Sequence, residues 1–157
     1  MDLEIRPATR ADALTVVQVV LSAFAEYDGA LQVRPSALSD TVEQAEHAIE
    51  QGGVLLAWDG GQAVGTVRYD LREDCLYVGR LAVAPSHRRR GVGAALMRYI
   101  EELAPTLGRN RIELATRQSM PGNLAFYGRL GYHVARTEPN KRGPDTNVWF
   151  AKEIASP

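Results

Sequence analysis

The stretch Ser86 to Leu96, SHRRRGVGAAL, places the densest positive charge of the chain beside its most flexible backbone. Three arginines at positions 88–90 precede Gly91, and Gly93 lies in the first turn of a predicted helix. A helix start has unpaired N–H groups and a positive dipole end, which attract anions. Glycines let an anion approach the backbone without a Cβ in the way. The stretch therefore predicts a turn that binds a phosphate or pyrophosphate through several contacts of about 0.3–1 kcal/mol each.

Two common nucleotide motifs do not match this turn. A Walker A loop needs Lys and Ser or Thr after its second glycine, where this chain has Ala94 and Ala95. A dinucleotide-binding turn would have its third glycine at Leu96, and it follows its strand directly rather than through a long loop. Glu113 does lie at about the offset expected of a ribose-binding acid. We therefore expect neither a magnesium–triphosphate site nor a dinucleotide site.

Composition limits the class of protein that carries this turn. The chain has 157 residues, 45% hydrophobic and 24% charged, with a net charge of −1. These values predict one globular domain, residues 1–157, and argue against nucleic-acid or membrane partners. The lone Cys75 excludes an internal disulfide and fits a reducing compartment. With neither a signal-peptide pattern nor a long apolar run, we expect a cytoplasmic protein.

The first half of the chain predicts helices followed by an antiparallel meander. Thr9 and Asp12 form a capping box before a helix with an apolar stripe, and a second helix is expected from Asp40, paired with Glu43, to Gly52. The stripe comprises Leu14, Val17, Leu21 and Phe24. Predicted strands follow, joined by tight turns that make them antiparallel. They comprise Val54–Trp58, a returning strand from Ala63 to Asp70, and Cys75–Val83, while a short separate strand, Leu3–Arg6, precedes the first helix.

The second half alternates helix and strand. A helix over Gly91–Leu103, with apolar residues at i, i+3, i+4 and i+7, leads to a strand over Arg111–Thr116. Strand, helix and strand in succession imply a right-handed crossover between parallel strands. A short helix, Gly122–Leu130, and strands near Tyr132–Thr137 and Thr146–Ile154 complete the chain. The pattern predicts a mixed α/β (α+β) fold with a largely antiparallel sheet.

The motif Arg88-Arg89-Arg90-Gly91-Val92-Gly93 follows RLAVAP (Arg80 to Pro85) and precedes NLAFYGRLGY (Asn123 to Tyr132). In this order and spacing the chain resembles the GNAT superfamily of acyl-CoA-dependent N-acyltransferases over essentially its whole length. The resemblance implies a central sheet with a parallel pair in its middle, flanked by about four helices. It also implies acetyl-CoA as the co-substrate.

By this resemblance, loop amides hold the pyrophosphate of coenzyme A and a strand edge pairs with its pantetheine arm. Leu81 and Val83 would pair with that arm, and Arg88 would add its side chain to the amides. Asn123 has two open assignments, a cofactor contact or a helix cap. The cofactor-binding residues so implied are Leu81, Val83, Arg88, Arg89, Gly91, Val92, Gly93, Ala94 and Asn123.

The resemblance also gives Tyr127 a role, because a tyrosine at this place in the family meets the sulfur of the thioester. An amine would attack the acyl carbonyl directly, an oxyanion would form near the N–H groups around Leu81, and a thiolate would leave. Proton transfer from a phenol to this thiolate is uphill by only about 2 kcal/mol. Tyr127 is therefore the expected general acid.

The general base is left unassigned. Deprotonating an ordinary amine at pH 7 costs about 4–5 kcal/mol. Many relatives carry a glutamate on the strand before the loop, at a position that falls near Tyr77, and the strand Cys75–Val83 has no carboxylate. Water, or one of Glu26, Asp28 and Glu113, is left as an alternative.

The acceptor is left open as well. Glu26, Tyr27 and Asp28 lie where relatives build the acceptor pocket and would suit a cationic amine, whereas Arg117 would suit an acidic acceptor. The three histidines lack ligand spacing, so no metal is expected. The sequence therefore predicts an N-acetyltransferase acting on a small-molecule or peptide amine, with a homodimer as a further expectation. The alternative is a non-catalytic acyl-CoA sensor on the same scaffold.

Overall fold

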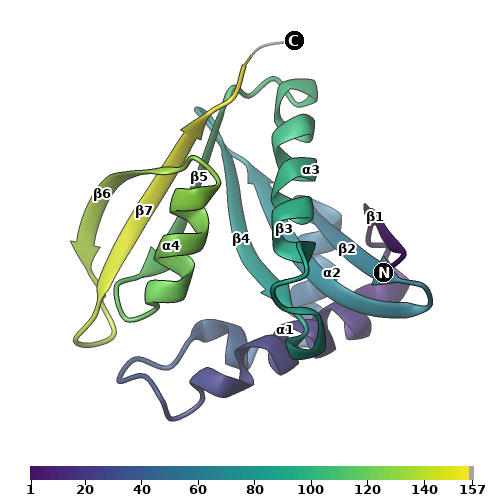
Figure 1. Ribbon diagram of the computed structural model, residues 1–157, viewed down its shortest axis with the longest axis horizontal. Helices are drawn as coiled ribbons and strands as arrows, with labels where there is room; N and C mark the ends of the chain where they lie inside the picture. Colours follow the sequence, from purple (N-terminus) through teal and green to yellow (C-terminus); the bar gives the residue numbers. More distant parts are fainter. Residues whose placement is uncertain (156–157) are drawn as a thin grey trace.

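The computed structural model describes residues 1–155 as a seven-stranded sheet with α1 and α2 on one face and α3 and α4 on the other (Figure 1). The helices are α1 (Ala13–Phe24), α2 (Val42–Gln51), α3 (Val92–Thr106) and α4 (Pro121–Arg129). The strands are β1 (Leu3–Pro7), β2 (Gly53–Asp59), β3 (Gln62–Leu71), β4 (Leu76–Val83), β5 (Arg111–Arg117), β6 (His133–Pro139) and β7 (Thr146–Glu153).

The strand order is β1-β2-β3-β4-β5-β7-β6, and the only parallel pair within this sheet is β4 with β5. The predicted mixed, largely antiparallel sheet with a central parallel pair and four helices is thereby confirmed. That residues 1–157 form one domain stays a prediction, and its last two residues lie outside the described part. No helix within residues 1–155 is long and apolar enough to cross a membrane.

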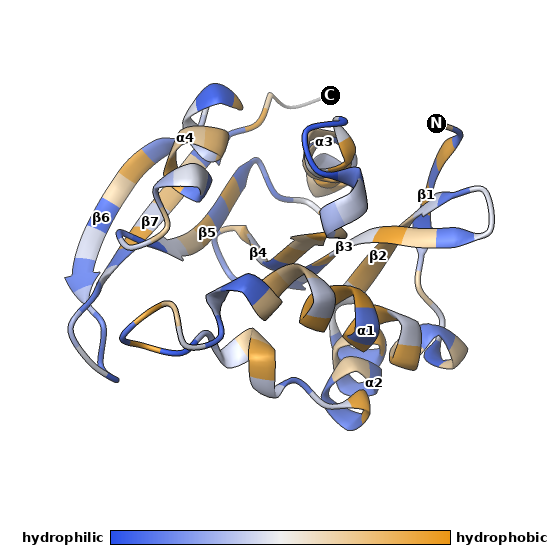
Figure 2. Ribbon diagram, turned by 60° about the horizontal axis from the view of Figure 1, so that its bottom comes forward, coloured by the Kyte–Doolittle hydropathy of each residue, from blue (hydrophilic) through white to orange (hydrophobic). Residues whose placement is uncertain are grey.

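Both faces of β2 are buried, which explains its continuous apolar run. Leu55 belongs to the core beneath α3, while its neighbour Leu56 belongs to the core beneath α1 and α2. Figure 2 shows hydrophobic residues along β2 and on α1. The alternation of neighbouring residues between the two faces fixes the register of the strand.

One helix cap is confirmed and one is wrong. The backbone N–H of Thr9 donates to Asp12 at 2.8 Å, as the capping box predicts. The cap of α2 is Thr41 with Gln44, one residue after the expected pair of Asp40 and Glu43. The reason is that the carboxylate of Asp40 is buried against two arginines of the sheet, so the next hydroxyl caps the helix.

The apolar stripe expected on α1 is wrong for two of its four members, because Val17 is buried and Phe24 is half-buried but Leu14 and Leu21 face solvent. Leu14 and Leu21 are 56% and 36% exposed, and the buried face is made instead of small and β-branched residues. Its members are Ala13, Val16, Val17, Val19, Val20 and Ala23. Because α1 packs against both the sheet and α2, its contact face is wide and favours side chains that allow close approach.

The sheet opens where β4 and β5 diverge. Their parallel pairing covers only Leu76–Val78 against Ile112–Leu114. On the other edge of β4, the register with β3 shifts between Thr66 and Arg68. Opposite this shift, Arg80 has a left-handed backbone with φ +53°, which is uncommon for a residue other than glycine. A bulge in β4 therefore turns the strand away from β5.

Candidate active site

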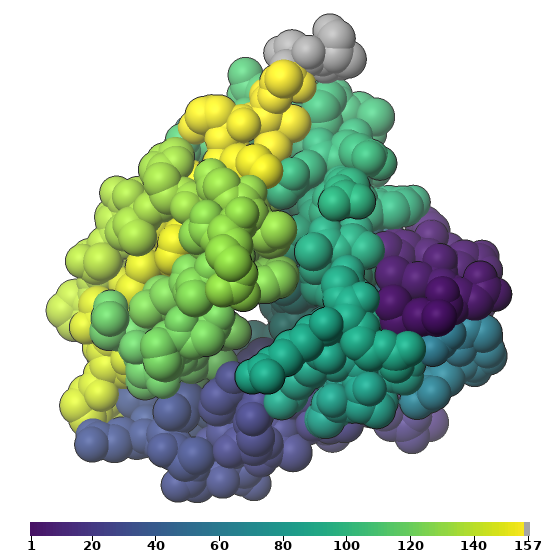
Figure 3. Space-filling view, in the orientation of Figure 1, coloured from purple at the N-terminus to yellow at the C-terminus, as the bar shows by residue number. Residues whose placement is uncertain are grey.

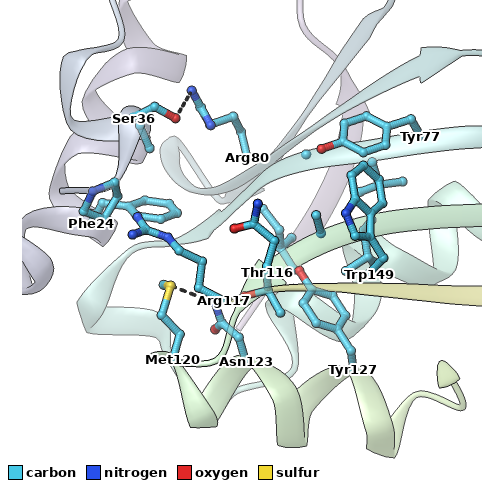
Figure 4. A pocket seen from close by; sticks show the side chains of 18 of the residues that line it. Phe24, Ser36, Tyr77, Arg80, Thr116, Arg117, Met120, Asn123, Tyr127 and Trp149 are labelled. Carbon is cyan, nitrogen blue, oxygen red and sulfur yellow. Dashed lines mark hydrogen bonds between the residues drawn. The ribbon is translucent and has the colours of Figure 1, made fainter. Parts of the chain in front are cut away.

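A cavity of about 340 Å³ lies between the diverging strands β4 and β5 (Figure 4). Its remaining walls come from α4, from β7 and from the segment between Phe24 and Ala37. Figure 3 shows an opening at the surface between α4 and the segment that leads into α3. The cavity is open to solvent and has a size within the usual range for small-molecule sites.

The arginine–glycine turn leaves a set of backbone amides free at the start of α3. Arg89 and Gly91 both have left-handed backbones, with φ +62° and +85°. The N–H of Ala95 bonds to the carbonyl of Gly91 at 3.0 Å. The amides of Val92, Gly93 and Ala94 come before this bond and have no partner of the helical kind. Arg89 and these three residues lie in this turn, and their contact with a cofactor stays a prediction.

The arginine–glycine turn is anchored by a buried histidine that sequence reasoning left without a role. His87 Nε2 lies 2.9 Å from Asp59 Oδ2, and its Nδ1 lies 2.7 Å from Ser86 Oγ. The hydrogen bond with His87 holds the pKa of Asp59 below its usual value. His87 thus fastens the turn to the hairpin between β2 and β3. Because Asp59 is 28 residues away in the sequence, no local pattern predicts this contact.

The side chain of Arg88 faces α1 rather than the free amides. Its guanidinium lies 2.8 Å from Glu26 Oε1 and donates to the carbonyl of Ala23 at 2.7 Å. The predicted contact between Arg88 and a pyrophosphate stays a prediction, and it requires the guanidinium to move or to share these partners.

The free edge of β4 faces the cavity beyond Val78. Leu81 lines the cavity, and Val83 lies next to the start of α3. A Cβ at Gly93 would lie 3.6 Å from Val83 and 3.2 Å from the ring of Phe126. Gly93 therefore lets α3 approach β4 and α4 closely. Main-chain groups of β4 are left for a ligand or water to pair with.

Tyr127 and Asn123 both line the cavity from α4, as their spacing of four residues predicts. Tyr127 is 7% exposed and packs against Phe126, with ring centroids 5.1 Å apart. Burial raises the pKa of its hydroxyl well above that of an ordinary phenol. Its hydroxyl has no hydrogen-bond partner within residues 1–155, and Figure 4 shows it directed into the cavity. Tyr127 thus presents a protonated phenol to the cavity.

Asn123 is not a helix cap. The cap of α4 is Met120, and Asn123 is the third residue of the helix. Its Nδ2 donates to Thr116 Oγ1 at 3.3 Å, across the base of the cavity. Of the two assignments left open by the sequence, the cap is wrong and the cofactor contact stays a prediction.

A buried ion-pair network, which no local sequence pattern predicted, holds the bulge of β4. Asp40, whose side chain is 4% exposed, accepts from Arg80 Nε at 3.1 Å, from Arg80 Nη2 at 3.2 Å and from Arg68 Nη2 at 3.0 Å. Ser36 accepts a further bond from Arg80 at 3.1 Å. A buried arginine in an apolar strand requires a carboxylate partner, so the positions of Arg68 and Arg80 in the sequence could have indicated a buried acidic residue.

The carboxylates proposed as bases lie away from the cavity walls. Glu26 pairs with Arg88, Asp28 pairs with Arg34, and Glu113 pairs with Arg111 at 3.0 Å. No Asp or Glu within residues 1–155 lines the cavity. Of the four acceptor-site candidates, Arg117 lines the cavity, whereas Glu26, Tyr27 and Asp28 do not.

Tyr77 lies on β4, near the strand position where the resemblance led us to expect a glutamate. Its ring lies under the guanidinium of Arg72, 3.9 Å from the ring centroid, and 5.9 Å from the ring of Trp149. Burial raises the pKa of Tyr77, so its hydroxyl faces the cavity as a neutral group (Figure 4). Tyr77 and Trp149 therefore form an aromatic wall, a role that sequence reasoning did not assign to either.

A sheet that opens between its parallel strands, beside a helix start with free amides, is the architecture of the N-acetyltransferase fold. The chain belongs to the acetyltransferase (GNAT) family, whose model matches residues 21–132.

Two known proteins with similar sequences are named as acetyltransferases. Mycothiol acetyltransferase of Geodermatophilus obscurus is 33% identical over 141 residues, which are 84% of this chain and 42% of that protein. Acetyl transferase GW6a of Oryza sativa subsp. japonica is 47% identical over 53 residues, 33% of this chain and 13% of that protein. The chain therefore spans less than half the length of these curated relatives.

Solved structures show the same fold at low sequence identity. PaiA N-acetyltransferase from Thermoplasma acidophilum, in complex with coenzyme A, has a TM-score of 0.83 at 18% identity, covering 98% of this chain and 100% of that chain. The ribosomal-protein-S18-alanine N-acetyltransferase from Escherichia coli has a TM-score of 0.77 at 18% identity, and the match covers 99% of this chain and 96% of that chain.

Proposed function

We propose that this chain transfers an acetyl group from acetyl-CoA to a primary amine. The observation that carries the proposal is one path along the open sheet, from the free amides of α3, past the unpaired edge of β4, to the hydroxyl of Tyr127. An elongated thioester with an anionic end suits such a path. Membership of the acetyltransferase family supports the same reaction.

When bound, acetyl-CoA supplies an activated thioester carbonyl. The amides of Val92, Gly93 and Ala94 would bind its diphosphate, and the edge of β4 would orient its amide-containing arm. N–H groups near Leu81 would stabilise the oxyanion that forms when the amine attacks. These groups are fixed before the reaction, so they need no reorganisation in the transition state.

The proton balance involves Tyr127. The new bond joins the amine nitrogen to the acetyl carbon, and the bond from that carbon to sulfur breaks. Tyr127 would donate its proton to the departing sulfur, the amine would lose its extra proton to water, and the phenol would regain a proton from solvent. Burial keeps Tyr127 protonated, and it raises the pKa of a thiol in the same cavity as well.

The variant Tyr127→Phe tests this role because it removes only the hydroxyl. General acids contribute about 10²–10⁴-fold, so kcat should fall at least ~100-fold in an assay of thiol release from acetyl-CoA. The dissociation constant of coenzyme A, measured by calorimetry, should stay within about twofold if the aromatic packing is kept.

A matched control is Tyr132→Phe. Its hydroxyl donates to Glu101 at 3.0 Å, outside the cavity, so turnover should be retained. Normal turnover by Tyr127→Phe would remove the proposed acid. Binding of coenzyme A without turnover of any amine would favour the non-catalytic acyl-CoA sensor, and no binding at all would contradict both functions.

A further inference from the structure

The charged side chains that line the cavity are all of one sign. Arg80, Arg117 and Arg142 contribute to its walls, and no Asp or Glu of the described chain does so. An acceptor must enter this cavity if the proposed function holds. The charge of the walls therefore bears on the chemistry of the acceptor.

The charge of Arg80 is neutralised by Asp40, a residue that does not line the cavity. Asp40 binds its guanidinium through both carboxylate oxygens, at 3.1 and 3.2 Å, and Ser36 takes a further donor. This arginine is held in place as part of the wall. It is not the group that would select a ligand.

Arg117 has unused donors beside the cavity. Its Nη1 donates to the carbonyl of Val33 at 2.6 Å and lies 3.5 Å from Asp145 Oδ2. Its Nε and Nη2 have no hydrogen-bond partner within residues 1–155. Figure 4 shows the side chain extending from β5 towards Phe24. Arg117 is 9% exposed as a residue, and a guanidinium in such a buried position that still has free donors suits an anionic group of a ligand.

Asp145 only partly compensates Arg117. Its carboxylate also accepts from the backbone and hydroxyl of Ser119 and from the backbone of Thr146 at 2.8 Å. Its oxygens are therefore shared among several donors. A second anion can bind Arg117 without displacing Asp145.

Arg142 adds a charge without an anionic partner. It lies within 4.0 Å of no carboxylate of residues 1–155, and its backbone N–H is held by Asn140 Oδ1 at 2.8 Å. Arg142 is close enough to Arg117 to contribute to lowering the pKa of Arg117, although burial is the larger cause. Two arginines and one aspartate give this end of the cavity a net charge of about one positive unit.

We infer that the acceptor is a small amine that carries a carboxylate, such as a free amino acid, an inference that rests on the proposed function. Arg117 and Arg142 bind the carboxylate, and the amine points towards Tyr127. A monoanion matches the net charge of this end, whereas a phosphate would exceed it. The cavity of about 340 Å³ must also hold the acetyl end, so the acceptor is small. A polyamine would be repelled by the walls.

The test compares amino acids with their own amides as acceptors of acetyl groups. Each pair has the same side chain and stereochemistry and differs in the carboxylate alone. The amine of the amide has the lower pKa, so chemical reactivity favours the amide near neutral pH. We expect kcat/KM to favour the carboxylate at least ~10-fold, the effect of one charge-assisted hydrogen bond. Phosphoethanolamine and 1,3-diaminopropane serve as the phosphate and cationic alternatives.

The variant Arg142→Gln should raise KM for the amino acid about 10-fold, change kcat little, and leave the amide unaffected. Lys141→Gln is the matched control, because it removes the same charge from the neighbouring residue, which does not line the cavity. Equal effects of the two variants on the amino acid would overturn the inference.

Calorimetric measurement of acetyl-CoA binding distinguishes a failure of the acceptor inference from a failure of the proposed function. If acetyl-CoA binds and the amides, the diamine or phosphoethanolamine are acetylated as fast as the amino acids, the acceptor inference is wrong while the proposed function stands. If acetyl-CoA does not bind, the proposed function fails and the inference fails with it.

Discussion

The buried carboxylate of Asp40 holds the bulge that opens the sheet, and Asp40→Asn tests its contribution. The variant removes one negative charge between Arg68 and Arg80 while keeping the shape of the side chain. Removing one partner of a buried ion pair costs about 3–5 kcal/mol. Because the two arginine side chains are 22% and 29% exposed, we expect the lower end, about 3 kcal/mol.

In a chain of this length, about 1 kcal/mol shifts Tm by roughly 2–4 °C, so Asp40→Asn should lower Tm by roughly 6–12 °C. Thermal unfolding followed by circular dichroism measures this shift. The control is Asp28→Asn, which breaks an exposed pair with Arg34 whose side chains are 61% and 49% exposed. Such pairs contribute at most about 1 kcal/mol. A Tm for Asp40→Asn equal to that of Asp28→Asn would refute this account of the bulge.

Three further predictions concern backbone strain, pH and thiol reactivity. Gly91→Ala should lower the free energy of unfolding in urea by roughly 1–2 kcal/mol, because the backbone has φ +85°. A Cβ there would meet nothing within 4 Å, so crowding is not the expected cause. Gly91→Asn should lower the free energy of unfolding by less, and equal losses for the two variants would point to crowding instead. Burial raises the pKa of Tyr127, so kcat/KM should rise with pH as the amine deprotonates and show no fall up to about pH 9.5; a falling limb below that pH would contradict the acid role. Burial also raises the pKa of Cys75, so thiol reagents should label it slowly in the folded protein and fully in urea, and rapid native labelling would count against its burial.

The features that the sequence predicted correctly depend on near neighbours in the chain. The glycines after Asp59 form the turn of the hairpin between β2 and β3, and Thr9 forms a capping box with Asp12, three residues later. Asn123 and Tyr127 lie on one face of α4 because four residues make about one helical turn. In each case the physical cause lies within a few residues, so a single sequence contains it.

The features that the sequence did not predict depend on packing between distant segments. Asp40 looked like a helix cap, yet the partners that bury it are 28 and 40 residues away. Leu14 looked like a core residue, yet α1 turns a different face, made of alanines and valines, to the sheet and α2. Arg142 gave no signal, because its importance comes from the unmatched charge beside Arg117. Such properties depend on the assembled fold rather than on local patterns.

The pairing of the strands shows that β4, and not β5, bends where the sheet opens. β5 is paired with β7 along all seven of its residues, from Arg111 to Arg117, so it is held straight. The divergence after Val78 must therefore come from β4, where the register shift and the left-handed backbone of Arg80 are found. Asp40 secures this bend from outside the cavity. A substitution that relaxes the bend should therefore weaken the proposed binding of coenzyme A without removing any group proposed to contact it, because the free edge of β4 would then pair with β5.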